Sequence, residues 1–139
     1  MTTFTKFNQF VEDIAKGVHN LSTGQLKVAL TNTAPVAANS VYADLTSPIA
    51  ATNLSGATPF NVTTTSCEQV SGTLTLVLVD LTLTATGSVG PFQYVVLYND
   101  TPSSPADPLI GWWDYGSAVT MANTETFLID FAATTISLS

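Results

Sequence analysis

The chain has very little charge, and its positive charge stops early. Only 9% of the 139 residues are charged, arginine is absent, and Lys6, Lys16 and Lys27 are the only basic residues. The remainder of the chain carries eight acidic residues: Asp44, Glu68, Asp80, Asp100, Asp107, Asp114, Glu125 and Asp130. Binding to nucleic acid needs cations that face phosphate groups, and attachment to anionic lipid needs them too. We therefore expect neither a nucleic-acid nor a membrane partner.

Residues that usually carry catalysis are scarce as well. His19 is the only histidine and Cys67 the only cysteine. His19 falls beside the apolar stripe of a predicted helix, which indicates a solvent-facing or interface position, and Cys67 has no neighbouring base or cation to activate its thiol. Asp100 and Asp107 share a loop and are a minor calcium candidate, although their spacing matches no known calcium loop. We expect no cofactor, no resident metal and no enzyme activity.

The number of cysteines and the length of the apolar runs indicate the cellular compartment in which the protein is made. A single cysteine cannot form an intrachain disulfide. The first residues lack the apolar run of a signal peptide, and the most apolar window, residues 74–83, is too short to cross a bilayer. These features predict a soluble protein made in a reducing cytoplasm. The length supports one domain, residues 1–139, with a sizeable core.

The N-terminal segment has a helical pattern. Its apolar residues recur at spacings of three and four and predict an amphipathic helix of about five turns: Phe4, Phe7, Val11, Ile14, Val18 and Leu21. Gly17 weakens the middle of this helix. We expect residues 1–24 to form a helix or arm, which either packs on the chain's own sheet or lies on another subunit.

Residues 25–139 have the short, Thr-rich apolar runs of an all-β domain. We expect a β-sandwich or jelly roll of about 7–9 strands, with a long surface excursion over residues 33–58. In residues 73–86 the leucines change from even to odd positions, which predicts a bend at Val79 and Asp80 that carries the strand from one sheet to another. Residues 118–121 and 125–131 read as a hairpin.

The strongly apolar segment of residues 92–98 is followed, after a proline-rich loop, by a second apolar segment, residues 109–116, with which we expect it to pair. The alternation puts Phe92 on the same face as Tyr94, and it points the adjacent Trp112 and Trp113 in opposite directions. We expect a buried central pair of strands with these core residues: Phe92, Tyr94, Val96, Tyr98, Trp113, Phe127 and Ile129. If Trp113 is core, Trp112 needs another cover, which could be a protein interface or a sugar.

Five blocks of sequence follow one another in the order residues 7–19 (FNQFVEDIAKGVH), 26–35 (LKVALTNTAP), 90–100 (GPFQYVVLYND), 109–116 (LIGWWDYG) and 125–131 (ETFLIDF). In sequence and in order, these blocks resemble small virion proteins of tailed bacteriophages. The resemblance spans nearly the whole chain. It implies a structural virion component, and we favour a capsid decoration (cement) protein.

This resemblance carries expectations about partners and location. It implies a location on the capsid exterior, with the major capsid protein and further copies of this chain, as a homodimer or homotrimer, as partners. The residues expected in capsid or subunit contacts are Phe4, Phe7, Val11, Trp112 and Asp114. The alternatives are a tail or fibre module that binds host glycan through its aromatic residues, and a tail-tube or connector component.

Overall fold

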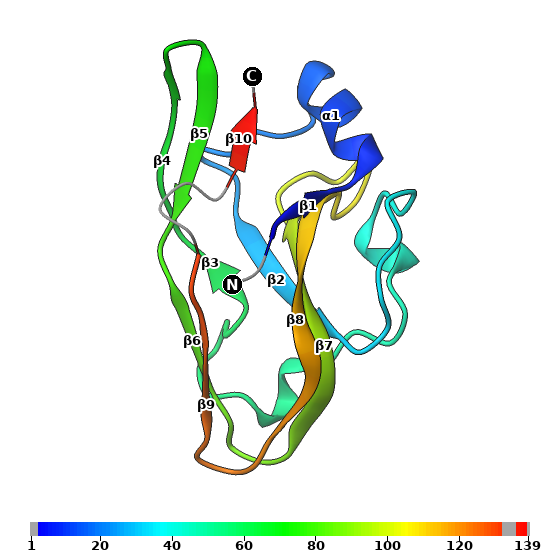
Figure 1. Ribbon diagram of the computed structural model, residues 1–139, viewed down its shortest axis with the longest axis vertical. Coiled ribbons are helices and arrows are strands. Elements are labelled where there is room, and N and C mark those ends of the chain that lie inside the picture. The colour runs from blue at the N-terminus through cyan, green and yellow to red at the C-terminus, as the bar shows by residue number, and fades with distance from the viewer. Residues whose placement is uncertain (1–2, 132–135, 139) are drawn as a thin grey trace.

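The computed structural model describes residues 3–131 and 136–138, which form two packed antiparallel layers (Figure 1). One layer is a five-stranded sheet in the order β1 (Thr5–Lys6), β8 (Leu109–Met121), β7 (Val89–Asn99), β2 (Leu26–Thr31) and β3 (Asn61–Val62). The other contains the three-stranded sheet β10 (Ile136–Leu138), β5 (Thr73–Leu78) and β4 (Thr64–Val70), and the two-stranded sheet β6 (Leu81–Thr84) and β9 (Thr126–Ile129). The predicted all-β sandwich with one N-terminal helix is confirmed.

The main core lies between the two layers. The five-stranded sheet contributes Val28, Val95 and Trp113, and the facing layer contributes Leu76, Leu83 and Ile129; each is at most 3% exposed. Burying an aliphatic side chain of this size contributes about 1.5–3 kcal/mol. The alternating apolar residues of each strand therefore hold the sandwich together.

The bend predicted within residues 73–86 is confirmed. β5 ends at Leu78 and β6 begins at Leu81, and the two strands belong to different sheets. Asp80 stabilises the corner, because its Oδ1 accepts a hydrogen bond of 2.9 Å from the backbone N–H of Phe131. Val79, also at the corner, donates its N–H to the carbonyl of Thr63.

The N-terminal helix is much shorter than predicted. Helix α1 covers only Asn8–Ala15. Gly17 adopts φ +73° directly after it. The N–H of Gly17 binds the carbonyl of Ile14, and the N–H of Val18 binds that of Asp13. This pattern is a Schellman motif, so Gly17 ends the helix where the sequence analysis placed its middle.

The hairpin predicted from residues 118–131 is wrong. Residues up to Met121 continue β8, whereas β9 pairs with β6 in the other layer. The turn between β8 and β9 is held against the other layer by Ala85, just after β6. The N–H of Ala85 donates to the carbonyl of Glu125, and the carbonyl of Ala85 accepts the N–H of Thr124. The segment is therefore a crossover between layers. Phe127, Ile129 and Phe131 do share the inward face, as expected, and each is at most 8% exposed.

Two irregularities change which face residues of β7 and β8 occupy. The register between these strands shifts between Phe92 and Tyr94, so Phe92 joins the main core while Tyr94 is half-buried. Ile110 is an extra residue between the pairs Leu97–Gly111 and Tyr98–Leu109, which makes it a β-bulge. The expected common face of Phe92 and Tyr94 is therefore wrong. Six of the seven expected core residues are buried: Phe92, Val96, Tyr98, Trp113, Phe127 and Ile129.

The long excursion after β2 covers the outer face of the five-stranded sheet. It includes the 3₁₀ helices η1 (Tyr42–Asp44) and η2 (Ala51–Asn53) and runs over the surface, as expected (Figure 1). Beneath it lies a second apolar group, here called the outer cluster, with Tyr42 and Trp112 packed against its side: Phe7, Ala29, Leu45, Val96, Tyr98 and Leu109. The five-stranded sheet is thus apolar on both faces, which explains the unbroken hydrophobic run in β7.

Candidate interaction surface

The N-terminal arm is part of the chain's own sheet. Thr5 pairs with Trp112, Lys6 pairs with Gly111, and the N–H of Phe7 donates a 3.1 Å hydrogen bond to the carbonyl of Ile110. The expectation that the arm packs on its own sheet is therefore confirmed for β1, and the alternative that it lies on another subunit is wrong for this segment.

The arm's two phenylalanines lie on opposite faces of the sheet, each against one of the adjacent tryptophans. Phe4 packs against Trp113 with ring centroids 4.9 Å apart, and Phe7 packs against Trp112 at 4.6 Å. The opposite orientation of Trp112 and Trp113 is confirmed by their separate clusters. Phe7 is only 1% exposed, so its expected role in capsid or subunit contact is wrong, because this residue covers Trp112 instead.

Trp112 remains half-buried at the rim of the outer cluster, and apolar side chains are exposed on the neighbouring elements. Val11 of α1 is 54% exposed and Val36 of the covering loop is 57% exposed. The loop reaches α1, since the N–H of Asn8 binds the carbonyl of Ala37. We call the side chains of Trp112, Tyr42, Val11 and Val36 the Trp112 surface.

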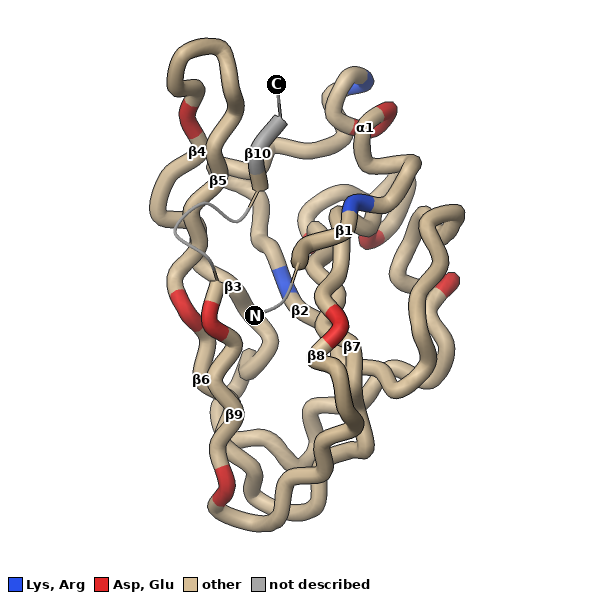
Figure 2. Tube along the Cα trace, in the orientation of Figure 1, with Lys and Arg blue, Asp and Glu red and all other residues tan. Residues whose placement is uncertain are grey.

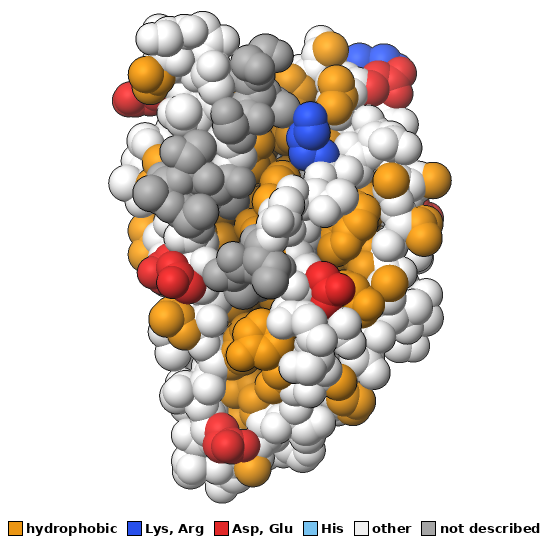
Figure 3. Space-filling view, viewed as in Figure 1, with side chains coloured by type: hydrophobic (Ala, Val, Ile, Leu, Met, Phe, Trp, Pro, Cys, Tyr) orange, Lys and Arg blue, Asp and Glu red, His pale blue; other side chains and the backbone are white. Residues whose placement is uncertain are grey.

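Two members of the Trp112 surface, Tyr42 and Val36, were missed by sequence reasoning because they lie in a segment without periodicity. In the structure, Tyr42 is fixed by its N–H to the carbonyl of Asp107 and by its ring, 5.0 Å from that of Tyr98. Burial raises the pKa of the Tyr42 hydroxyl above its usual value. In the space-filling view, hydrophobic side chains are visible along the line between the two layers and beside the β1–β8 edge (Figure 3).

Asp114, another expected contact residue, is exposed and also has a structural role. Its Oδ1 accepts hydrogen bonds from Gln93 Nε2 at 2.9 Å and from the N–H of Gly116 at 2.8 Å. Gly116 adopts φ +95°, a conformation that favours glycine. Asp114 therefore stabilises the irregular part of β8 beside Trp112.

The charged groups are distributed unevenly over the fold. The three lysines lie on or beside α1, β1 and β2, whereas acidic residues are scattered along the chain in both layers (Figure 2). Lys16 forms an exposed ion pair with Glu12 at 2.8 Å. Exposed pairs of this kind contribute little to stability. No helix in residues 3–131 and 136–138 is long and apolar enough to span a membrane.

His19 is half-buried, so the expected solvent-facing position is only partly right. Its Nδ1 lies 3.2 Å from Nδ2 of the buried Asn99, and its ring meets Phe10 edge-on at 5.2 Å. Burial lowers the pKa of the imidazole, and the nearby Asp13 opposes that shift. Asp13 is itself only 3% exposed. These residues fix the α1–β2 connection against the end of β7.

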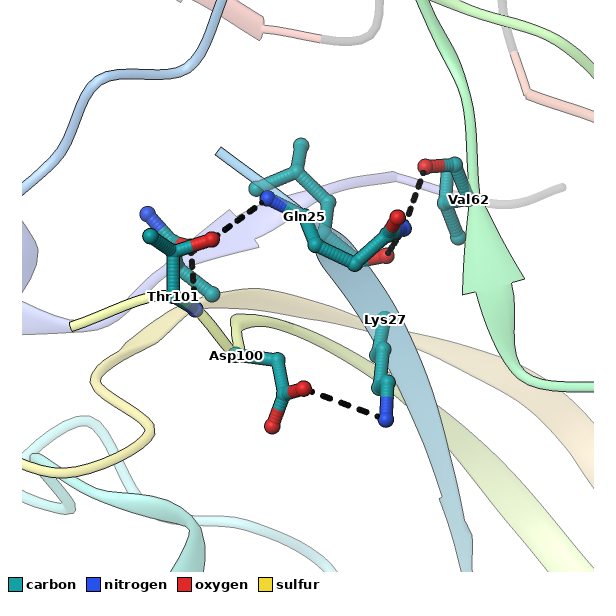
Figure 4. A network of polar contacts seen from close by, with 7 residues as sticks. Gln25, Lys27, Val62, Asp100 and Thr101 are labelled. Carbon is teal, nitrogen blue, oxygen red and sulfur yellow. Dashed lines mark hydrogen bonds and ion pairs between the residues drawn. The ribbon is translucent and has the colours of Figure 1, made fainter. Parts of the chain in front are cut away.

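The two carboxylates of the calcium candidate do come together. Asp100 forms an ion pair with Lys27 at 3.2 Å, within a polar network at the ends of β2 and β7 (Figure 4). Partial burial raises the pKa of the Asp107 carboxyl, and the hydrogen-bonded Asp100 raises it further. No group of three or more His, Cys, Asp or Glu side chains that could hold a metal occurs among the described residues. With Lys27 neutralising one of its carboxylates, the pair does not fit a calcium site.

The same network joins β2 to the loop after β7. Gln25 donates its N–H to Oγ1 of Thr101 at 2.7 Å, and its side-chain Nε2 donates to the carbonyl of Val62 at 3.2 Å. Figure 4 shows Gln25 between Thr101 on one side and Val62 on the other. This arrangement ties β2, β3 and the end of β7 together, which is a structural role.

The described part of the chain contains no detected pocket. No family model, no curated protein and no solved structure matches the chain.

Proposed function

We propose that this chain is a non-enzymatic structural protein of a tailed-phage virion, which binds the capsid exterior and stabilises it as a decoration protein. The observation that carries the proposal is the half-buried Trp112 of β8, together with exposed Val11 of α1, which contacts β8, and exposed Val36 of the loop that reaches α1. Tryptophan is enriched among the few residues that supply most of the binding energy in protein interfaces. A decoration protein needs such a surface and no catalytic pocket.

The charge balance supports the outer side of a DNA-filled shell. The formal net charge is −7, and no basic residue follows Lys27. A protein of this charge gains nothing from contact with packaged DNA, because the phosphate backbone repels it. The major capsid protein is then the proposed partner.

The test is binding to phage heads that lack the protein. We expect saturable, stoichiometric binding of the wild type and at least about 30-fold weaker binding of Trp112→Ala, the loss expected when an aromatic anchor is removed. Leu128→Ala is the matched control, because Leu128 is also an exposed apolar residue, at 53%, but lies in β9 of the other layer. Circular dichroism and urea unfolding check that Trp112→Ala is folded.

Three results would contradict the proposal. They are no binding to heads, equal weakening by Trp112→Ala and Leu128→Ala, and binding to DNA. Trp113→Ala provides the contrast for folding, since Trp113 is 3% exposed and packs against both Phe4 and Phe131. We expect it to lose stability, whereas Trp112→Ala loses mainly binding.

A second candidate function, glycan binding by a tail or fibre module, is favoured by Tyr115. This residue is 45% exposed, its ring packs edge-on against Phe127 at 5.1 Å, and Asp114 precedes it in β8. An exposed aromatic ring can stack on the apolar face of a sugar. Immunogold labelling restricted to tails, together with glycan-array binding lost in Tyr115→Ala, would replace the first proposal with this one.

A further inference from the structure

Strand β4 leaves one edge of its sheet open. It is the outer strand in the order β10–β5–β4, and within the described residues it pairs only with β5. The turn between them has φ +51° at Ser71 and +82° at Gly72, as in a type I′ hairpin, so Val70 and Thr73 form its closing hydrogen-bonded pair. Backbone groups then alternate along the strand, and those of Cys67 and Gln69 point away from β5.

Several other edges of the sandwich are protected. β1 and β3 have two residues each, and β1 carries Lys6. The far edge of β6 is covered, because the N–H of Ser55 binds the carbonyl of Thr84. The part of β8 beyond Trp112 is broken by the irregularity at Gly116. Short strands, lysines, covering loops and bulges are the usual means of preventing edge-to-edge pairing.

β4 lacks most of these protections. With seven residues it is the longest edge strand among the described residues, and its pairing with β5 is unbroken from Ser66 to Val70. It contains no proline and no lysine, and Glu68 is its one charged residue. Val70, at the end of the strand, is 60% exposed. An unprotected strand of this kind is a template for another strand.

We propose that β4 binds β4 of a second copy of this chain, antiparallel and about a two-fold axis at Cys67. In this register Ser66 lies opposite the partner's Glu68, and Thr64 lies opposite the partner's Val70. The outward backbone groups of Cys67 meet their own symmetry mates, so both copies gain the same hydrogen bonds. The three-stranded sheets of the two copies become one continuous sheet.

The single charge on β4 discriminates against one alternative register of the two copies. A shift by one residue that centres the axis on Glu68 would place two carboxylates directly opposite each other, which destabilises a strand pair. The axis at Cys67 avoids that repulsion and pairs the full length of the strand. This proposal does not rest on the proposed function, because it concerns the purified protein alone.

Two variants that place opposite charges at Ser66 test whether β4 pairs with β4 of a second copy. In the proposed dimer, Ser66→Glu faces the partner's Glu68 and Ser66→Lys forms an ion pair with it, twice per dimer. We expect the dimer dissociation constant, measured by sedimentation over a concentration series, to rise about 2- to 30-fold in Ser66→Glu and to fall by a similar factor in Ser66→Lys. Thr82→Glu and Thr82→Lys are matched controls, since Thr82 is an exposed residue of β6.

The single cysteine tests the register. The two Cys67 residues would form a hydrogen-bonded pair with Cα atoms about 5.5 Å apart, a separation that a disulfide can bridge. Oxidation with copper phenanthroline is done at about pH 9, because burial raises the pKa of the Cys67 thiol. We expect a covalent dimer that reducing agent reverses and that Cys67→Ser abolishes.

The proposal is overturned by a protein that stays monomeric throughout the concentration series, or by trimers, rings or tubes. It is also overturned if both charges at Ser66 shift the equilibrium in the same direction. The proposed register is wrong if the dimer dissociation constant changes as expected in the two Ser66 variants but oxidation gives no crosslink through Cys67.

Discussion

Replacing Gly111 by alanine should release the N-terminal arm. A Cβ atom at this position would lie 2.2 Å from Cζ of Phe4, 2.5 Å from its Cε2 and 2.6 Å from the carbonyl oxygen of Thr5. Distances this short cannot be tolerated. Part of the obstruction is backbone, and the Phe4 ring is held against Trp113, so neither neighbour can give way at low cost.

The protein can respond to the added methyl group in two ways, and the response that costs less free energy sets the loss of stability. Squeezing an extra methyl group into a packed site costs about 1–3 kcal/mol. Detaching the arm costs the burial of the half-buried Phe4, about 1 kcal/mol, and β1 hydrogen bonds worth about 1 kcal/mol each. We therefore expect Gly111→Ala to lower the free energy of unfolding by about 2–3 kcal/mol. With about 2.1 cal/mol/K per residue over 139 residues, or about 0.29 kcal/mol/K, Tm falls by about 7–10 °C.

Urea and thermal unfolding of a double-mutant cycle check this reasoning. In a Phe4→Ala background the ring that obstructs the new methyl group is gone, so Gly111→Ala should cost about 1 kcal/mol less than in the wild type. Strictly additive costs, or a fall in Tm below about 2 °C for Gly111→Ala alone, would refute the packing of the arm over Gly111.

Two further predictions concern the α1–β2 segment. Gly17→Ala should lower the free energy of unfolding by about 1–2 kcal/mol, measured in urea. Gly17 adopts φ +73° with open space around it, so the cost is backbone strain alone. Gly17→Asn should cost less, because asparagine tolerates this conformation better, and equal costs for the two variants would count against the helix-ending motif. Burial lowers the pKa of His19 in the folded state, so below the unfolded value of about 6.5 the unfolded chain binds more protons and stability falls as pH falls. Unfolding free energies measured from about pH 7.5 to about pH 5.5 should decline less in His19→Gln than in the wild type, and parallel declines would contradict the burial of this imidazole.

The strand corner was predictable because its signal is local. The change of leucine phase near Val79 follows directly from side-chain alternation, and no distant contact is needed to interpret it. The buried segment of β7 was recognised for the same reason, since an apolar run indicates cover on both faces. The adjacent tryptophans had to point apart on any regular strand.

The sequence predictions were wrong where contacts between residues far apart in the sequence determine the structure. Nothing near Glu125 in sequence shows that Ala85 hydrogen-bonds to it, so the crossover looked like a hairpin. The bulge at Ile110 changes faces without a local marker. Phe7 has the spacing of the apolar stripe of a helix, yet it lies before α1 and covers Trp112. Sequence reasoning identified Trp112 as the residue in need of cover and missed that the chain supplies part of this cover itself.

The strand order also bears on synthesis at the ribosome. Among the described residues β1 pairs only with β8, and β2 pairs with β7 and β3, so the five-stranded sheet cannot be completed until residues up to Met121 have emerged. At about 5–20 residues per second, β1 waits roughly 5–25 s for its partner. For about 3–14 s of this interval, until β7 ends at Asn99, the apolar run of β2 is without its main neighbour and is open to non-native contacts in the nascent chain.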